Sequence, residues 1–206
     1  LLTQVEVDED DPAFDDPSKF IGAFYTEEEA RRIEAEMGWR MKEDFGRGWR
    51  HVVPSPKPQH VCDISLVQVL ARRGTIVIAG GGGGIPVVRG PKGVRRGVQA
   101  VIDKDLTSAH MANVLGIELL MILTAVPRVA VDFGKPGQRE LDQVTMRELR
   151  ALHAEGHFPP GSMGPKIEAA LRFLEGGGER VIIAHLDEAM TALHGEAGTH
   201  VLADDA

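Results

Sequence analysis

Internal disulfide bonds are excluded in this chain, because Cys62 is the only cysteine among its 206 residues. A single thiol is typical of a protein in a reducing cytoplasm, and the apolar neighbours Val61 and Ile64 indicate a buried core thiol rather than a nucleophile. No apolar run reaches membrane-spanning length, since LLMILTAV at 119–126 is only strand-sized. The chain also starts with acidic residues, where a signal peptide needs positive charge. We therefore expect a cytoplasmic protein with no membrane partner.

An excess of positive charge is lacking as well. The net charge is −8, and residues 1–50 hold fourteen acidic against seven basic side chains. A general nucleic-acid binder would be basic, so this partner is excluded. The rest of the chain is nearly neutral, and local lysines there could still hold a small polyphosphate.

Short apolar runs alternate with helix patterns after His51, which predicts an open α/β sheet with helices on both faces. The predicted strands are 75–79, 98–102, 117–126, 129–133, 181–185 and 200–203. The predicted helices are 61–73, 106–115, 145–156, 163–175 and 187–194, and residues 89–97 are predicted to form a turn or loop. Upstream, a capping box at Thr26 and Glu29 and a stop at Gly38 predict a further helix. Residues 9–50 are expected to project as a subdomain.

Five consecutive glycines, Gly80 to Gly84, end the β-branched run TIVIA. They lack the dinucleotide fingerprint, because Ile85 stands where its last glycine would fall, and they lack the lysine of a P-loop. A flexible turn is one interpretation. We favour contact with phosphate or substrate, because strand ends are where open α/β sheets bind ligands.

Two lysine-bearing segments, VIDKD at 101–105 and GSMGPK at 161–166, are the other candidates. The first is either a solvated loop with Asp105 capping a helix or a phosphate site around Lys104, and the residues favour neither. The second places Lys166 in the first turn of a helix, where free N–H groups and the helix dipole favour an anion. Ser162 fits a cap or a phosphate donor better than a nucleophile. The histidines do not form a zinc site, so no metal-binding residues are predicted.

These motifs, in this order, resemble the carbamate kinase family of the amino-acid kinase superfamily. The segments that carry the resemblance are TQVEVDEDDPAF, KFIGAFYTEEEA, GRGWRHVVPSPKP, GGGGIPV, VIDKDL, ILTAV, EGHFPPGSMGPK and ERVIIAHL. The resemblance implies a three-layer αβα sandwich on a mainly parallel open sheet, with the amino-terminal part of the family missing. Residues 1–50 would be the end of the amino-terminal region with a protruding lid subdomain, and residues 51–206 a nucleotide-binding α/β domain.

The implied reaction is reversible phosphoryl transfer between ATP and carbamate, giving ADP and carbamoyl phosphate, with Mg²⁺ bridging phosphates. The implied setting is a cytoplasmic homodimer in arginine or purine catabolism. The alternatives are another acyl-phosphate-forming kinase of this fold and a nucleotide-binding fragment without catalysis. The chain alone is expected to be inactive, because half of the family's active site is not in it.

Site residues follow from the same resemblance. Lys104 and Lys166 would contact the nucleotide phosphates, Asp105 would orient the lysines, and Lys19 would reach the transferring phosphoryl group from a mobile lid. Phe20 and Ala23 stand where that lid often has proline, which could loosen it. The remaining nucleotide-binding residues would be Gly81, Gly82, Gly83, Thr124, Ala125, Ser162, Met163 and Gly164.

Overall fold

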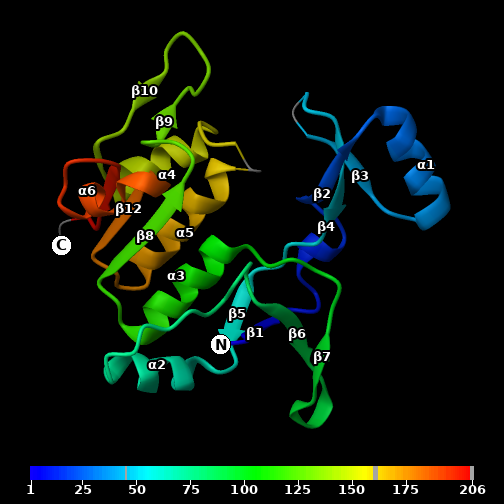
Figure 1. Cartoon of the computed structure of the whole chain (residues 1–206), viewed down its shortest axis with the longest axis horizontal. Helices are drawn as coiled ribbons and strands as arrows, with labels where there is room; N and C mark the ends of the chain where they lie inside the picture. The colour runs from blue at the N-terminus through cyan, green and yellow to red at the C-terminus, as the bar shows by residue number, and fades with distance from the viewer. Residues whose placement is uncertain (45, 160–161, 205–206) are drawn as a thin grey trace. The chain divides into compact units, whose positions relative to one another are not determined.

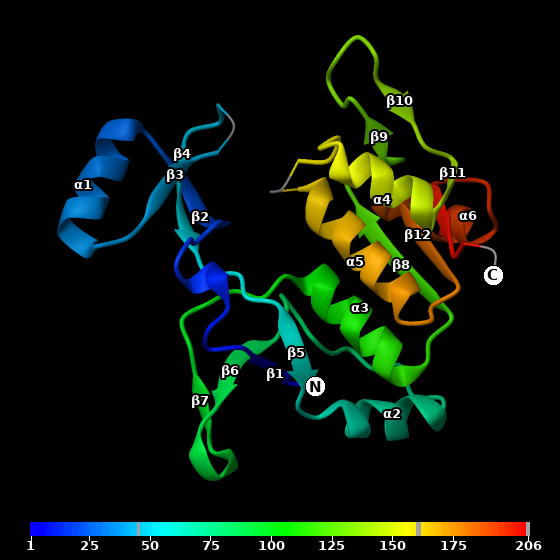
Figure 2. The same cartoon turned by 180° about the vertical axis from the view of Figure 1, so that it is seen from behind.

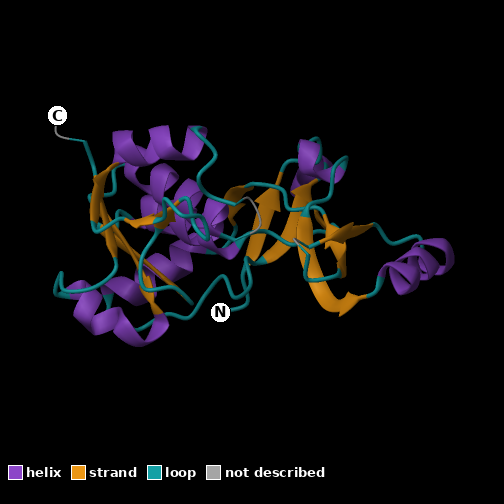
Figure 3. Ribbon diagram, turned by 90° about the horizontal axis from the view of Figure 1, so that it is seen from above, coloured by secondary structure: helices purple, strands orange, loops and turns teal. Residues whose placement is uncertain are grey.

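The computed structural model describes residues 1–44, 46–159 and 162–204, and it confirms the α/β class. Contacts divide the chain into two units. The first unit is Leu1–Asp63 with Val77–Lys104, and the second is Ile64–Ile76 with Asp105–Ala206. Helix α1 belongs to the first unit, whereas α2 to α6 belong to the second, with α3 starting at the boundary residue Lys104. Figure 3 distinguishes the helices of the chain from its strands by colour. Within the described ranges, no helix has the length and apolar character needed to cross a membrane.

One four-stranded sheet of the first unit has the order β5, β1, β6, β7. Its strands are β1 (Gln4–Val7), β5 (Pro58–Val61), β6 (Ile85–Arg89) and β7 (Arg95–Gly97). β1 pairs in parallel with β6 and antiparallel with β5. β6 and β7 form an antiparallel hairpin around the short 3-10 helix η2 (Pro91–Gly93). The predicted turn at residues 89–97 is therefore a hairpin.

A second sheet of the first unit has the order β2, β4, β3, and all of its pairings are antiparallel. It consists of β2 (Lys19–Tyr25), β3 (Met41–Glu43) and β4 (Trp49–Val53), with the 3-10 helix η1 (Pro12–Phe14) upstream. Helix α1 (Glu27–Met37) packs on β3 and β4, and we call these four elements the lid subdomain. The predicted capping box of α1 and its left-handed stop at Gly38 are confirmed.

Aromatic rings and arginines hold the lid subdomain together. The Trp39 and His51 rings stack with their centroids 4.3 Å apart, and the Arg31 guanidinium lies 4.5 Å from the centroid of the Trp49 ring. Burial against the neighbouring ring lowers the pKa of His51. Contacts of this kind stabilise a subdomain that has few buried aliphatic side chains.

Asp44 is the buried acid of this subdomain. Its Oδ1 accepts a hydrogen bond from Arg47 Nη2 at 2.7 Å, and its Oδ2 accepts one from Arg50 Nη1 at 3.2 Å. Burial raises the pKa of Asp44, but the two arginines outweigh it, so the pKa lies below its ordinary value of 3.8.

We expect Asp44→Asn to destabilise the chain at pH 7 by about 1.5–3 kcal/mol, because charge-assisted hydrogen bonds are lost. A lowered pKa in the folded state contributes stability above the unfolded pKa, and this contribution disappears as the pH falls through the folded value. The gap between parent and variant should therefore close below pH 3.8. Thermal unfolding between pH 7 and 3 measures this, with the exposed Glu43→Gln as control. A gap that stays constant over that range contradicts the assignment.

The sheet of the second unit has the order β11, β13, β12, β8. Its strands are β8 (Leu119–Thr124), β11 (Gln143–Thr145), β12 (Arg180–His185) and β13 (Thr199–Leu202). β12 runs parallel to β8 and β13 parallel to β11, but β12 and β13 are antiparallel. Two short strands, β9 (Ala130–Val131) and β10 (Arg139–Glu140), form a separate antiparallel ladder. The two four-stranded sheets of the described residues are thus mixed, where the sequence predicts a mainly parallel one.

Alternating side chains of β12 create the layers of the second unit. Val181 and Ile183 face one core, while Ile182 and Ala184 face another. The first core is covered by α3 (Lys104–Leu115), α4 (Met146–Ala154) and α5 (Met163–Glu175), and the second by α6 (Ala189–Leu193), which follows the 3-10 helix η3 (Leu186–Glu188). Figures 1 and 2 show these helices on the two sides of β8 and β12. This unit is an αβα sandwich.

Two predicted strands are wrong. Residues 75–79 form no strand, and Ile76 and Ile78 are 94% and 82% exposed. Residues 98–102 are also irregular, although Ile102 is fully buried and Val101 N donates to Pro54 O at 2.9 Å. β-branched composition indicates a fit to a sheet, but a strand needs a partner that composition does not supply.

The helix predicted at 61–73 is shorter, because α2 (Ile64–Arg72) starts after β5 has ended at Val61. Cys62 lies between the two and is half-buried rather than buried. Desolvation raises the pKa of its thiol, which disfavours the reactive thiolate. The raised pKa supports the interpretation that Cys62 is not a nucleophile. The prediction that Cys62 is buried in the core is wrong, because the residue is only half-buried.

Candidate functional site

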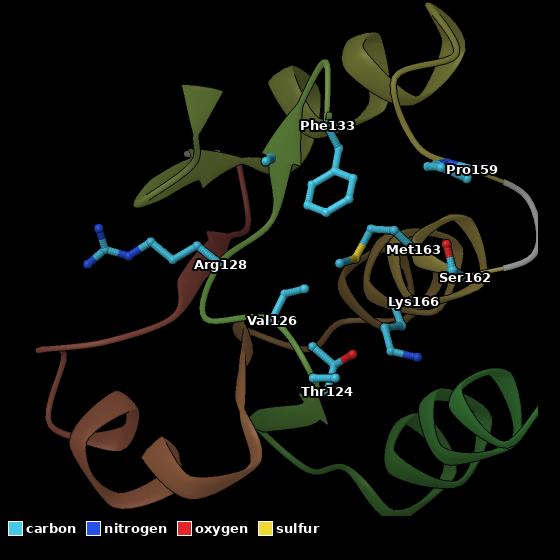
Figure 4. A pocket seen from close by; sticks show the side chains of 10 residues that line it. Thr124, Val126, Arg128, Phe133, Pro159, Ser162, Met163 and Lys166 are labelled. Atoms are coloured by element: carbon cyan, nitrogen blue, oxygen red, sulfur yellow. The ribbon is translucent and has the colours of Figure 1, made fainter. Parts of the chain in front are cut away.

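A pocket of about 320 Å³ opens in the second unit, and its walls are mostly apolar. It is lined by Thr124, Ala125, Val126, Arg128, Ala130, Phe133, Pro159, Ser162, Met163 and Lys166. Figure 4 shows these side chains around the cavity, with Lys166 and Ser162 on α5 and its first turn. Five of the lining residues, namely Thr124, Ala125, Ser162, Met163 and Lys166, were predicted as site residues from the sequence. The structure brings these five together.

The local fold explains why these residues meet. Thr124 is the last residue of β8, and its partner in the parallel neighbour β12 is the last residue, His185. The pocket therefore lies at the carboxyl end of parallel strands, where open α/β sheets bind ligands. Met163 begins α5, and Ser162 is its N-cap residue but makes no side-chain capping hydrogen bond. The Ser162 hydroxyl is thus not committed to the helix end.

Gly164 is required by the fold beside the pocket. Its amide donates to Pro159 O at 2.8 Å, and a Cβ at this position would lie 2.9 Å from the same oxygen. The close approach brings the chain before α5 against the first turn of that helix. Gly161, in the same predicted turn, lies outside the described residues.

Phe133 is the lining residue that the sequence interpretation missed most clearly. Its ring is 62% exposed, although it borders an apolar cavity. The preceding Asp132 has a left-handed φ of 52°, and its Oδ1 lies 3.4 Å from both Lys135 Nζ and His157 Nδ1. This tight turn sets the direction of the Phe133 ring. The sequence analysis places Phe133 at the end of a predicted strand, residues 129–133, and a phenylalanine at such a strand end was the available signal.

Lys166 reaches the pocket from α5 and is held by a carboxylate of α3. Its Nζ lies 3.0 Å from Asp105 Oδ2, and both side chains are largely buried. The predicted orientation of a lysine by Asp105 matches this contact. A buried ion pair of this kind fixes an ammonium group in one place beside an apolar cavity.

Lys19 belongs to the first unit and has a carboxylate partner there. It is the first residue of β2, and its Nζ lies 2.6 Å from Asp103 Oδ2. Asp103 lies in the segment VIDKD but is not among the predicted site residues. Lys104, between the two aspartates, is an exposed residue at the start of α3. The two aspartates that flank Lys104 therefore contact different lysines: Asp103 contacts Lys19, and Asp105 contacts Lys166.

The glycine run forms a turn in the first unit, beside a second pocket of about 340 Å³ whose lining includes Gly81 and Gly82. The amide of Gly80 donates to Thr3 Oγ1 at 2.9 Å. A Cβ on Gly83 would lie 2.0 Å from Ile102 O, whereas a Cβ on Gly82 would meet nothing within 4 Å. Packing thus explains Gly83 and does not explain Gly82. The predicted phosphate contact of Gly81, Gly82 and Gly83 stays a prediction.

No group of three or more histidine, cysteine or acidic side chains among the described residues is arranged to hold a metal ion. Asp103 and Asp105 each contact a lysine instead. Lys166 and Arg128 are the charged residues in the described lining of the pocket at the end of β8, which contains no carboxylate, so this pocket offers cations to a ligand.

The chain is similar to proteins of known sequence and to proteins of known structure. The model of the amino acid kinase family matches residues 21–185. The carbamate kinase of Pyrococcus furiosus is 50% identical over 202 residues, and a carbamate kinase-like protein of Escherichia coli is 46% identical over 203 residues. Each match covers 98% of this chain, which spans 64% of the length of either relative.

Two solved structures of carbamate kinase from Giardia lamblia are also similar. The one bound to citric acid has a TM-score of 0.92 at 42% identity, and the one bound to AMP-PNP has a TM-score of 0.85 at 43% identity. Both comparisons cover 99% of this chain, and they cover 64% and 65% of the solved chains.

Proposed function

Since this chain belongs to the amino acid kinase family, we propose that the whole protein is a carbamate kinase. It would transfer a phosphoryl group reversibly between ATP and carbamate, giving ADP and carbamoyl phosphate. The structural match over 99% of the chain confirms the predicted fold of this family. The observation that carries the proposal is the pocket at the end of β8, where predicted residues gather around Lys166.

The composition of that pocket supports a nucleotide as the ligand. Val126, Phe133 and Met163 offer apolar contact area that suits the faces of a purine base. Lys166 and the Ser162 hydroxyl supply donors for phosphate oxygens at the first turn of α5, where the helix dipole also favours an anion. One relative of known structure binds the ATP analogue AMP-PNP. An apolar wall beside a cation is what a purine nucleotide requires.

The proposed roles follow the resemblance residue by residue. Lys104 and Lys166 contact the phosphates, and Asp105 orients Lys166 through the 3.0 Å contact. Backbone amides of the glycine run approach the transferring group, and Lys19 neutralises its charge. Phosphoryl transfer needs positioning and charge neutralisation more than covalent chemistry. Carbamate is already an anion, so no general base is assigned.

Mg²⁺ bound through the substrate phosphates would supply further charge neutralisation. The described residues contain no acidic cluster for it. Mg²⁺ keeps several waters and binds substrate phosphates readily, which fits a chain that offers lysines instead of free carboxylates. We assign no residue of this chain as a metal ligand.

The proposed setting is the cytoplasm, with the protein as a homodimer in arginine or purine catabolism. The single half-buried cysteine supports a reducing compartment. The acidic net charge of −8 supports small-molecule substrates over nucleic acid.

The test is ATP formation from carbamoyl phosphate and ADP by the full-length protein. We expect turnover that depends on both substrates. Nucleotide binding without turnover would favour the non-catalytic alternative, and turnover with a different acyl phosphate would favour another kinase of this fold. Either result contradicts the proposal.

Lys19→Ala should separate turnover from binding in the same assay. We expect kcat to fall about tenfold or more, because a charge-assisted contact to the moving phosphoryl group is lost. The affinity for ADP, measured by titration, should stay within about twofold, since a lid residue acts after binding. Lys57→Ala, outside the proposed site, is the control and should change neither quantity. An equal loss of affinity and turnover would place Lys19 in ground-state binding instead.

A further inference from the structure

We propose that Asp103 is the positioning residue for Lys19, so that a buried carboxylate fixes the ammonium group that acts on the transferring phosphoryl. The inference rests on the proposed function, since it concerns the role of Lys19 in phosphoryl transfer. It adds Asp103, which is not among the site residues that the resemblance implies.

The ion pair is asymmetric in its burial. Lys19 Nζ lies 2.6 Å from Asp103 Oδ2, and the Lys19 side chain is 34% exposed whereas that of Asp103 is 7% exposed. One partner is therefore anchored in the protein, and the other keeps part of its side chain exposed to solvent. A reactant anion could approach that ammonium without displacing the carboxylate from the interior.

The backbone that carries Asp103 is held on its amino-terminal side. Ile102 is fully buried, and its carbonyl oxygen lies so near Gly83 that any Cβ there would clash with it. Val101 N donates to Pro54 O at 2.9 Å. These contacts fix the carboxylate within the first unit. A lysine side chain has many rotamers in solution, and a fixed partner removes most of this freedom before the substrate arrives.

Lys19 lies at the boundary of the lid subdomain, where the position of its side chain depends on the position of the lid. It is the first residue of β2 and pairs with Val53 at the end of β4, so it marks the point where the lid subdomain starts and ends. A change in the lid would move the Lys19 backbone, while Asp103 holds the far end of its side chain. The pair therefore keeps the ammonium in place when the strand behind it shifts.

A second lysine–aspartate ion pair in the same unit has an exposed carboxylate instead of a buried one. Lys42 Nζ lies 2.8 Å from Asp16 Oδ1, which is nearly as short, but the Asp16 side chain is 82% exposed. Exposed pairs contribute little, because solvent screens them and both side chains remain mobile. The Lys42–Asp16 pair has the same two charged groups but no buried carboxylate, so it is a matched control for Lys19–Asp103.

The experiment measures ATP formation by the full-length protein carrying Asp103→Asn. We expect kcat to fall about tenfold, which corresponds to about 1.4 kcal/mol of transition-state stabilisation, while the KM for ADP stays within about twofold. Asp16→Asn should leave both unchanged. If Asp103 acts only through Lys19, then Asp103→Asn should cause no further loss in a Lys19→Ala background.

Each of the following results would overturn the proposal. An equal loss from Asp103→Asn in the presence and absence of Lys19 means that Asp103 acts independently, and a gain in turnover means that the pair is an inhibitory latch. Unchanged turnover in Asp103→Asn means that the pair has no role, whereas an inactive parent enzyme removes the proposed function together with this inference.

A second variant, Asp103→Glu, is used if Asp103→Asn folds poorly. It keeps the negative charge but moves the carboxylate by one methylene. This variant should then lower kcat with the melting temperature retained, and a parental kcat would refute positioning.

Discussion

Lys166→Met is expected to slow phosphoryl transfer by the full-length protein about 100-fold or more, the loss typical when one preorganised charge donor is removed from an active site. Lys166 is the cation that lines the pocket on α5, and Asp105 holds its Nζ at 3.0 Å. Methionine keeps most of the apolar stem and removes the ammonium. Initial rates at saturating ADP and carbamoyl phosphate measure the effect, and nucleotide titration shows how much of it is lost binding.

Lys166→Met is expected to change the stability of the protein as well as its rate of phosphoryl transfer. Because Lys166 and Asp105 are both largely buried, removing one charge should also lower the melting temperature. The double variant Lys166→Met/Asp105→Asn leaves no opposite charge uncompensated and should recover part of that stability. Activity that stays lost in the stable double variant supports a role in transfer. Recovery of activity together with stability would mean that Lys166 is only structural.

Gly83→Ala is expected to destabilise the chain by about 3 kcal/mol or more, because backbone strain and overpacking each cost about 1–3 kcal/mol. Gly83 has a left-handed φ of 133°, and a Cβ would lie 2.0 Å from the carbonyl oxygen of Ile102. The backbone at Ile102 cannot move easily, since its side chain is fully buried. Denaturant unfolding followed by circular dichroism measures the loss.

Gly82→Ala is the matched comparison, one residue away. Its φ lies outside the left-handed region, and a Cβ there would meet nothing within 4 Å. We expect unfolding like that of the parent. If the glycine run contacts phosphate, this variant should nevertheless lose transfer activity in the full-length protein. Equal destabilisation by both substitutions would show that the turn, rather than the contact with Ile102, sets the cost.

The sequence predicted the parts of the fold that depend on neighbours along the chain. The capping box at Thr26 is present as expected, because its hydrogen bonds join residues three positions apart. The helix predicted from residue 145 starts with the same motif, formed by Thr145 and Glu148. The run at 75–79 was predicted as a strand and is not one, because pairing depends on distant residues. The antiparallel pairing of β12 with β13 could not be predicted for the same reason.

The candidate site was predictable where a motif carried it. Thr124, Ser162 and Lys166 were found because their segments have a recognisable order, and they meet in one pocket. Phe133 was missed, because its exposure depends on the left-handed turn at Asp132. Asp103 was left open, since only coordinates show which lysine a carboxylate contacts.

The aromatic contacts of the lid subdomain make it visible by intrinsic fluorescence. Both tryptophans of the chain, Trp39 and Trp49, lie between Lys19 and Val53, and so does its one tyrosine, Tyr25. One indole stacks on His51 and the other lies under Arg31, and both are neighbours that quench or shift emission when they move. Emission excited at the indole band therefore reports on the lid subdomain alone. The same spectrum is silent about the pocket beside Lys166, which needs a nucleotide carrying its own fluorophore.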